Sequence, residues 1–218
     1  MGDKGNRRWQ RAQRHELRWW KKYLSRKDSA EYHRWKEDYW KQLIARLPDG
    51  VMPDAGDTVL DLGCGPAGIF MALPKYRVVA IDPLLDDYKR DGLLQSEKFP
   101  WVEFITGNIE HLSDMKSPLV LCMNVLNHVE DLSASLKSLR AATSDNGHFV
   151  MTIDVHRNAL LRTILRLIPI DRLHPHQHTL KEYVRLIEAN GLGIVHSEPI
   201  WKRGPLGHWL VVASAVQK

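Results

Sequence analysis

Cysteine is scarce in this sequence, and several other features are missing. Cys64 and Cys122 are the two cysteines among 218 residues, and they form neither C-x-x-C nor any other metal-type spacing. This excludes a disulfide-rich scaffold and leads us to expect a reducing compartment, the cytoplasm. No apolar run approaches the ~18 residues of a membrane span, and the charged start MGDKGNRRWQ lacks the apolar core of a signal peptide. We therefore expect no membrane partner.

Charge is unevenly distributed along the chain. Residues 1–47 contain 14 Lys and Arg against 6 Asp and Glu, whereas the remainder contains 17 against 20. The chain has the length of one domain with an accessory element, so this pattern indicates a basic arm on a slightly acidic body. A basic arm can bind nucleic acid, but we favour a solvated helix face.

The arm is predicted to form two amphipathic helices. Between residues 7 and 24, aromatic side chains recur at helical spacings of three and four. Asp28 followed by Glu31 is typical of a capping box that begins a second helix, and turn-forming residues follow it from Pro48. Because five of the eight tryptophans lie in this arm, we expect residues 1–50 to cap a large apolar surface.

From residue 51 the sequence pattern changes to short runs of β-forming residues that alternate with helical stretches. Such alternation is typical of βαβ units and a parallel sheet. The predicted strands cover residues 58–62, 77–81, 102–106, 119–123, 148–153, 193–198 and 208–213. The last two have no clear helix between them, so we expect an antiparallel pair.

A glycine-rich turn follows the first predicted strand. Gly63, Gly65 and Gly68 lead into an apolar run, Ile69–Leu73, which we expect to be a helix. Glycines here let the backbone approach a nucleotide closely. The spacing also matches dinucleotide-binding dehydrogenases, but Asp61 before the turn would repel a pyrophosphate. Asp82 ends the second strand, where a carboxylate can accept hydrogen bonds from ribose hydroxyls.

These motifs resemble the class I S-adenosylmethionine-dependent methyltransferases over residues 55–218, and specifically the small-molecule branch that begins with VLDLGCG. The resemblance implies an α/β, Rossmann-like fold for residues 51–218, with a mostly parallel seven-stranded sheet and the two-helix cap. It also implies S-adenosyl-L-methionine as cofactor. The implied cofactor-binding residues in the first two motifs are Asp61, Gly63, Cys64, Gly65, Asp82 and Pro83.

Two later motifs extend the resemblance. In the family's third motif an acid followed by an apolar residue recognises adenine, and here Asn108 and Ile109 take those places. An amide can still donate and accept hydrogen bonds. The fourth strand leads to Asn124, which the resemblance implies to bind the cofactor, and to His128, beside the expected position of the methyl group. This segment lacks the motifs of DNA amino-methylation and of cytosine methylation, and we interpret Cys122 as a small buried strand residue.

Methyl transfer requires alignment of the acceptor and removal of a proton, and neutral histidine is a suitable base. Our candidates are His128, His156 and His174, with Asp154 and His176 as substrate-binding residues. The alternating histidines from His174 could bind a metal, but no carboxylate or cysteine lies at matching spacing, so we expect no metal.

The arm is our candidate for a lid over the substrate. Glu16, Trp19, Trp20 and Tyr23 are the predicted substrate-binding residues there, although the aromatics could be packing contacts only. A carboxylate on an apolar stripe is costly to bury unless it meets a donor or a cation, which favours a lid. The amphipathic stretch 158–168 is expected to pack on the sheet or to shape the roof of the pocket, and not to lie on a membrane.

The predicted function is methyl transfer to an oxygen or nitrogen atom of a small-molecule acceptor. The alternative is an RNA or protein methyltransferase that docks a polyanion with the basic arm, which predicts steep salt dependence. A nicotinamide-dependent oxidoreductase is disfavoured by Asp61. A binding-only relative stays open, because this reaction class has no universal catalytic residue.

Overall fold

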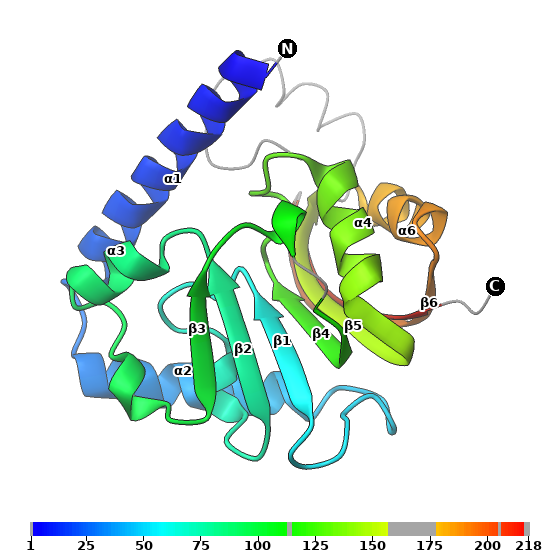
Figure 1. The fold of residues 1–218 in the computed structure, drawn as a ribbon, viewed down its shortest axis with the longest axis horizontal. Coiled ribbons are helices and arrows are strands. Elements are labelled where there is room, and N and C mark those ends of the chain that lie inside the picture. Colours follow the sequence, from blue (N-terminus) through cyan, green and yellow to red (C-terminus); the bar gives the residue numbers. More distant parts are fainter. Residues whose placement is uncertain (1, 113–114, 157–177, 205, 216–218) are drawn as a thin grey trace.

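A seven-stranded sheet forms the centre of the protein (Figure 1). The structure is a computed structural model that describes residues 2–112, 115–156, 178–204 and 206–215. The strands are β1 (Thr58–Leu62), β2 (Arg77–Asp82), β3 (Val102–Thr106), β4 (Ser117–Met123), β5 (Thr143–His156), β6 (Leu192–Arg203) and β7 (Leu206–Ala215). Their order is β3-β2-β1-β4-β5-β7-β6, and β7 is antiparallel to both of its neighbours. This confirms the predicted fold class and the antiparallel pair.

Helices cover both faces of the sheet. The α-helices are α1 (Gly2–Leu24), α2 (Ser29–Ile44), α3 (Leu85–Arg90), α4 (Leu132–Ala142) and α6 (Leu180–Ala189). Successive strand residues point to opposite faces, so Val150 joins a core with Trp40 and Leu43 of α2, whereas Met151 joins a core with Leu136 of α4. Figure 1 shows α2 on one side of the sheet and α4 and α6 on the other.

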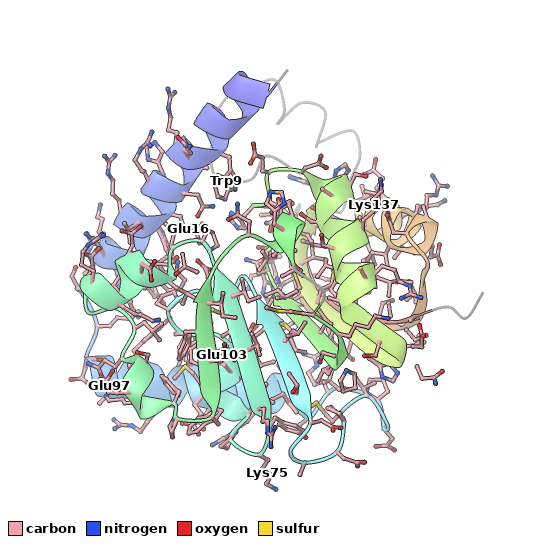
Figure 2. All side chains as sticks on the ribbon, in the orientation of Figure 1. Trp9, Glu16, Lys75, Glu97, Glu103 and Lys137 are labelled. Carbon is pink, nitrogen blue, oxygen red and sulfur yellow. The ribbon has the colours of Figure 1, made fainter. Side chains whose placement is uncertain are left out.

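The two predicted arm helices are present. The side chain of Asp28 caps α2 by accepting a hydrogen bond from the backbone N–H of Glu31 at 2.8 Å. Whereas α2 packs on the sheet, α1 extends from beside α3 past the ends of the β1, β2 and β3 arrows (Figure 1). Trp9 and Glu16 lie on the side of α1 that faces the strands (Figure 2). The domain boundary at residue 50 stays a prediction.

The prediction of an α-helix after the glycine turn is wrong. Ile69–Ala72 form a short 3₁₀ turn instead. Pro74 lacks an N–H and cannot continue a helix, and β2 begins soon after it at Arg77. The backbone N–H of Phe70 donates to the Asp61 side chain at 3.1 Å. The connection is therefore too short for a regular helix, and α2 covers this part of the sheet.

Some predictions concern residues outside the described ranges. They are the helix at 158–168 and the candidate residues His174 and His176. Within the described helices, no segment combines the length and the apolar character needed to cross a membrane. The described part of the chain also contains no group of three or more potential metal ligands.

Candidate functional site

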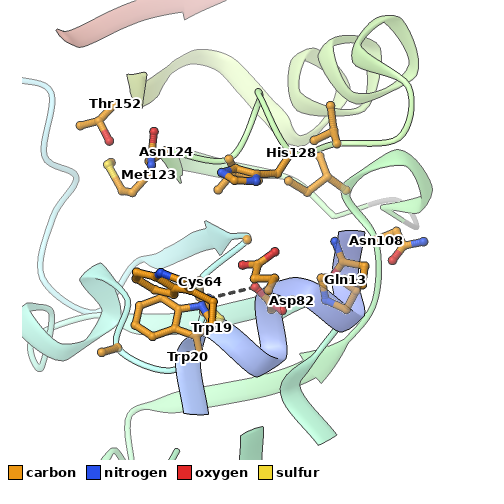
Figure 3. Close-up of a pocket in the computed structure, with 18 of the residues that line it drawn as sticks. Gln13, Trp19, Trp20, Cys64, Asp82, Asn108, Met123, Asn124, His128 and Thr152 are labelled. Atoms are coloured by element: carbon orange, nitrogen blue, oxygen red, sulfur yellow. Dashed lines mark hydrogen bonds between the residues drawn. The ribbon is translucent and has the colours of Figure 1, made fainter. Parts of the chain in front are cut away.

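A cavity of about 620 Å³ lies at the carboxyl ends of the parallel strands, beneath α1. This volume falls within the roughly 300–1,000 Å³ range of small-molecule sites. In Figure 3, Trp19, Trp20 and Asp82 lie on one side of it and Met123, Asn124 and His128 on the other. Three groups of residues line it: the glycine turn and strand ends, the segment after β4, and the aromatic faces of α1 and α2.

The glycine turn forms one wall of the cavity. Its backbone has positive φ angles that glycine adopts more easily than other residues. Gly63 has a φ of +69°, and a Cβ atom there would lie 2.5 Å from a methyl carbon of Val125. Gly65 has a φ of +59°, and a Cβ atom there would lie 3.8 Å from Trp20 of α1. The turn therefore exposes its backbone to the cavity directly under the aromatic side chains of α1.

Two backbone N–H groups hold the carboxylate of Asp82 in the cavity wall. One oxygen accepts a hydrogen bond from the N–H of Gly65 at 2.9 Å, and the other accepts from Leu84 at 2.8 Å. Burial raises the pKa of Asp82 to about 6, although both hydrogen bonds oppose this shift. A carboxylate has about four acceptor positions, so Asp82 can still bind hydroxyl groups of a ligand.

Glu16 of α1 lines the same cavity as Asp82 and senses its charge. Burial and the negative charge of Asp82 raise the pKa of Glu16 to about 7, whereas a hydrogen bond from the Trp20 side chain opposes this shift. Glu16 is therefore partly protonated near neutral pH and can donate or accept a hydrogen bond. The adjacent Trp19 is 48% exposed and stacks on Tyr23 with ring centroids 4.9 Å apart.

Lys36 of α2 supplies a cation to this mainly apolar wall. Its ammonium lies 4.2 Å from the ring centroid of Trp40 and 5.1 Å from that of Tyr39. Burial lowers the pKa of Lys36 to about 8, although the charge of Asp61 opposes this shift. With this pKa, Lys36 is still largely charged at neutral pH. Its ammonium, held among aromatic rings, can therefore bind an anionic group of a ligand.

Asn124 occupies an unusual backbone position at the end of β4. Its φ is +60°, a conformation that asparagine tolerates better than most residues, and its N–H donates to the carbonyl of Thr152 at 2.9 Å. Its Oδ1 atom is buried, and no described group donates a hydrogen bond to it. Because buried acceptors are normally paired, this oxygen is available to a ligand.

A histidine that lines the cavity is paired with a carboxylate of the neighbouring strand. Asp154 of β5 and His208 of β7 are paired in the antiparallel register, so their side chains lie on the same face. Nδ1 of His208 lies 2.7 Å from Oδ1 of Asp154. The His208 ring also stacks on Trp201 of β6, with an interplanar angle of 15°. His208 itself lines the cavity.

The cavity brings together most of the candidate residues that the structure describes. Those that line it are Glu16, Trp19, Trp20, Gly63, Cys64, Gly65, Asp82, Pro83, Asn108, Ile109, Asn124 and His128. Asp61 is 1% exposed and lies behind the turn, where it accepts the N–H of Phe70. Asp154 reaches the cavity through His208, and neither Tyr23 nor His156 lines it. The functional roles of all these residues stay predictions.

Sequence reasoning missed several residues of the cavity. Lys36 interrupts the apolar stripe of α2 much as Glu16 interrupts that of α1, and this signal could have identified it. Trp35 and Tyr39 of α2 also line the cavity, although the predicted lid residues came from the first arm helix alone. His208 carries no local signal, because its pairing with Asp154 depends on a strand register between distant segments.

Comparison with known protein families gives one match that covers most of the chain. Residues 32–197 match the family described as a methyltransferase domain. An uncharacterized methyltransferase of Schizosaccharomyces pombe is 32% identical over 105 residues, which are 42% of this chain and 38% of that protein. The mitochondrial ubiquinone biosynthesis O-methyltransferase of the same organism is 30% identical over 152 residues, 62% of this chain and 53% of that protein. The chain thus spans less than two thirds of these relatives.

A solved structure shares the fold. Geranyl diphosphate C-methyltransferase from Streptomyces coelicolor, in complex with Mg²⁺, geranyl diphosphate and S-adenosyl-L-homocysteine, has a TM-score of 0.63. The likeness covers 86% of this chain and 82% of that protein at 16% sequence identity.

Proposed function

This chain belongs to the methyltransferase-domain family, and we propose that it is an S-adenosylmethionine-dependent enzyme that methylates an oxygen or nitrogen atom of a small-molecule acceptor. The observation that carries this proposal is the cavity of about 620 Å³, which α1 and α2 cover with aromatic side chains. A covered cavity of this kind suits a metabolite. The similarity to an O-methyltransferase of ubiquinone biosynthesis supports an oxygen atom of a small molecule as the acceptor.

The residues of the cavity fit the cofactor. Asp82 would hold the ribose hydroxyls with its remaining acceptor positions, while the Gly65 N–H fixes its orientation. The Oδ1 atom of Asn124 is a buried acceptor that lacks a donor among the described residues, as expected where a ligand supplies one. Asn108 and Ile109, which line the cavity, would contact adenine.

When bound, the cofactor supplies an activated methyl group on a sulfonium. The protein's residues then have three tasks: they bind, they orient and they exclude water. Trp19 and Trp20 of α1 cover the glycine turn, and Asp82 fixes the ribose end. Trp35 and Tyr39 of α2 offer flat apolar surfaces to the acceptor.

Calorimetric titration tests the cofactor site and the alternative readings together. We expect micromolar binding of S-adenosylmethionine and S-adenosylhomocysteine and no binding of NADH. A screen of hydroxyl- and amine-bearing metabolites with a labelled methyl donor then tests the acceptor class. Labelling of RNA or protein but of no metabolite, with a steep loss of activity as salt rises, would instead favour a polyanionic substrate on the basic arm.

A further inference from the structure

We propose that His208, oriented by Asp154, accepts the proton of a phenolic acceptor during methyl transfer. This inference rests on the proposed function and makes its acceptor class more specific. It assigns the base to a strand residue at the end of the cavity. The base is therefore none of the histidines that sequence reasoning identified.

The position of the pair follows from the sheet. Thr152, Asp154 and His208 lie on the face of β5 and β7 that α2 covers, and both Thr152 and His208 line the cavity. The backbone of Thr152 holds the N–H of Asn124 at the end of β4. The histidine is therefore joined through one strand to the segment beside which the methyl group is expected.

The orientation of the ring leaves one nitrogen for a substrate. Nδ1 of His208 lies 2.7 Å from the Asp154 carboxylate, so an ionised Asp154 favours the tautomer with the proton on Nδ1. Nε2 is then a bare acceptor on the other side of the ring. Across the described residues, we find no hydrogen bond to Nε2. Trp201 stacks on the ring and restricts its rotation.

The surroundings favour a flat acceptor with a hydroxyl group. Trp35, Lys36 and Tyr39 of α2 line the same cavity. A phenol can stack on the aromatic rings, and the Lys36 ammonium stabilises the negative charge that develops on its oxygen. The hydroxyl group of a phenol is almost entirely un-ionised at neutral pH, since its ordinary pKa is about 10. A base that removes this proton therefore assists methylation of a phenol.

The transfer balances as a displacement with a proton transfer. The acceptor oxygen forms a bond to the methyl carbon while the carbon–sulfur bond breaks, and its electron pair goes to sulfur. The hydroxyl proton passes to Nε2 of His208 and is later released to solvent. The products are the methyl ether, S-adenosylhomocysteine and one proton.

Titratable groups approach this pair from both faces of the sheet: α2 packs on the face that carries the pair, and α6 packs on the opposite face. Tyr39 of α2 and Tyr183 of α6 both sense the charge of Asp154, which contributes to raising the pKa of each phenol after burial, the main cause. Lys36 lies in the same cavity.

The first test determines the tautomer of the His208 imidazole directly and does not require enzymatic turnover. We would record nitrogen NMR spectra of the ¹⁵N-histidine-labelled full chain at neutral pH, assigning His208 by comparison with His208→Gln. We expect Nδ1 protonated and Nε2 bare, and we expect Asp154→Asn to reverse this tautomer preference. A proton on Nε2 of the wild-type protein would overturn the inference whatever the acceptor is.

The second test measures methylation of a panel of phenols, from nitrophenols that ionise readily to alkylphenols that do not. For alkylphenols we expect His208→Gln to lower kcat by about 100-fold or more and to change KM by less than about 3-fold. For nitrophenols the loss in kcat should be within about 10-fold, because they need no base. A purely structural role would lower both classes equally, and that result overturns the inference.

Two controls separate the possible failures. His196→Gln changes a histidine of β6 that does not line the cavity, so it should leave both classes of phenol unaffected. Titration with S-adenosylhomocysteine should give the wild-type Kd in His208→Gln, which shows that the fold and the cofactor site are intact. A wild-type protein that binds cofactor but methylates no phenol would overturn the phenolic acceptor class and this inference, while methylation of another metabolite would leave the proposed function standing.

Discussion

The indole N–H of Trp40 donates a hydrogen bond to the backbone carbonyl of Ala67 at 3.0 Å, in a buried environment. This bond joins the second helix of the arm to the turn that contains Gly63 and Gly65. The arm is therefore part of the structure that shapes the cofactor site.

Replacement of Trp40 by phenylalanine should destabilise the protein. The substitution keeps an aromatic ring but leaves the Ala67 carbonyl without its donor, which costs about 1–3 kcal/mol in the free energy of unfolding. Urea denaturation measures this loss. Trp35→Phe is the matched control, since Trp35 lies on the same helix and is 54% exposed. Equal effects of the two substitutions would mean that the hydrogen bond contributes little.

Replacement of Asp82 by asparagine should weaken cofactor binding. Two charge-assisted hydrogen bonds to ribose hydroxyls contribute about 1.5–3 kcal/mol each, so we expect Kd for S-adenosylhomocysteine to rise by at least about 10-fold. Calorimetry provides the Kd values, and Asp86→Asn, at an exposed position of α3, is the control. An unchanged Kd in a folded Asp82→Asn protein would remove the ribose assignment.

The stability of the protein should fall as pH rises from about 4.5 to 7, in part because of Glu16. Its pKa is raised from 4.5 to about 7, so over this range the folded state binds more protons than the unfolded chain does. Ionisation then favours unfolding, by at most about 3 kcal/mol for this shift. Glu16→Gln should lose less stability between pH 5 and pH 8 than the wild type.

Urea denaturation at the two pH values checks this prediction. Glu103→Gln, on the exposed side of β3, should behave like the wild type. If Glu16→Gln shows the full pH dependence, Asp61 and Asp82 carry the effect, since the pKa of each is also raised by burial.

Two truncations should have different consequences. Removal of residues 1–24 deletes α1 and opens the cavity, so the protein should unfold cooperatively but bind S-adenosylhomocysteine at least about 10-fold more weakly. Removal of residues 1–47 also deletes Tyr32, Trp40 and Leu43 from the core, and this protein should aggregate. Circular dichroism and size-exclusion chromatography distinguish the two cases. Full cofactor affinity without α1 would argue against a lid.

The sequence predicted helix starts and strands well because these features depend mainly on residues that are neighbours in the chain. Asp28 caps α2 as expected. Every predicted strand lies inside a strand of the structure. The segment Ile69–Leu73 was misjudged because its apolar pattern suits a helix, whereas its length is set by Pro74 and by the packing of α2. Those constraints depend on tertiary structure.

The cavity was partly predictable for a similar reason. Gly63, Gly65 and Asp82 belong to motifs whose spacing fixes their position at the strand ends. Lys36 left a signal as a charge within an apolar stripe. His208 left none, because its partner is 54 residues away in the chain and their contact depends on the β5–β7 register.

That register has a consequence for the order in which the protein is made. β7 is synthesised after every other strand described, yet it lies between β5 and β6. Until Leu206–Ala215 leave the ribosome, β6 has no neighbour in the sheet and Asp154 has no histidine beside it. A nascent chain can thus complete the glycine turn and the ribose site early, whereas the Asp154–His208 pair forms only when β7 inserts.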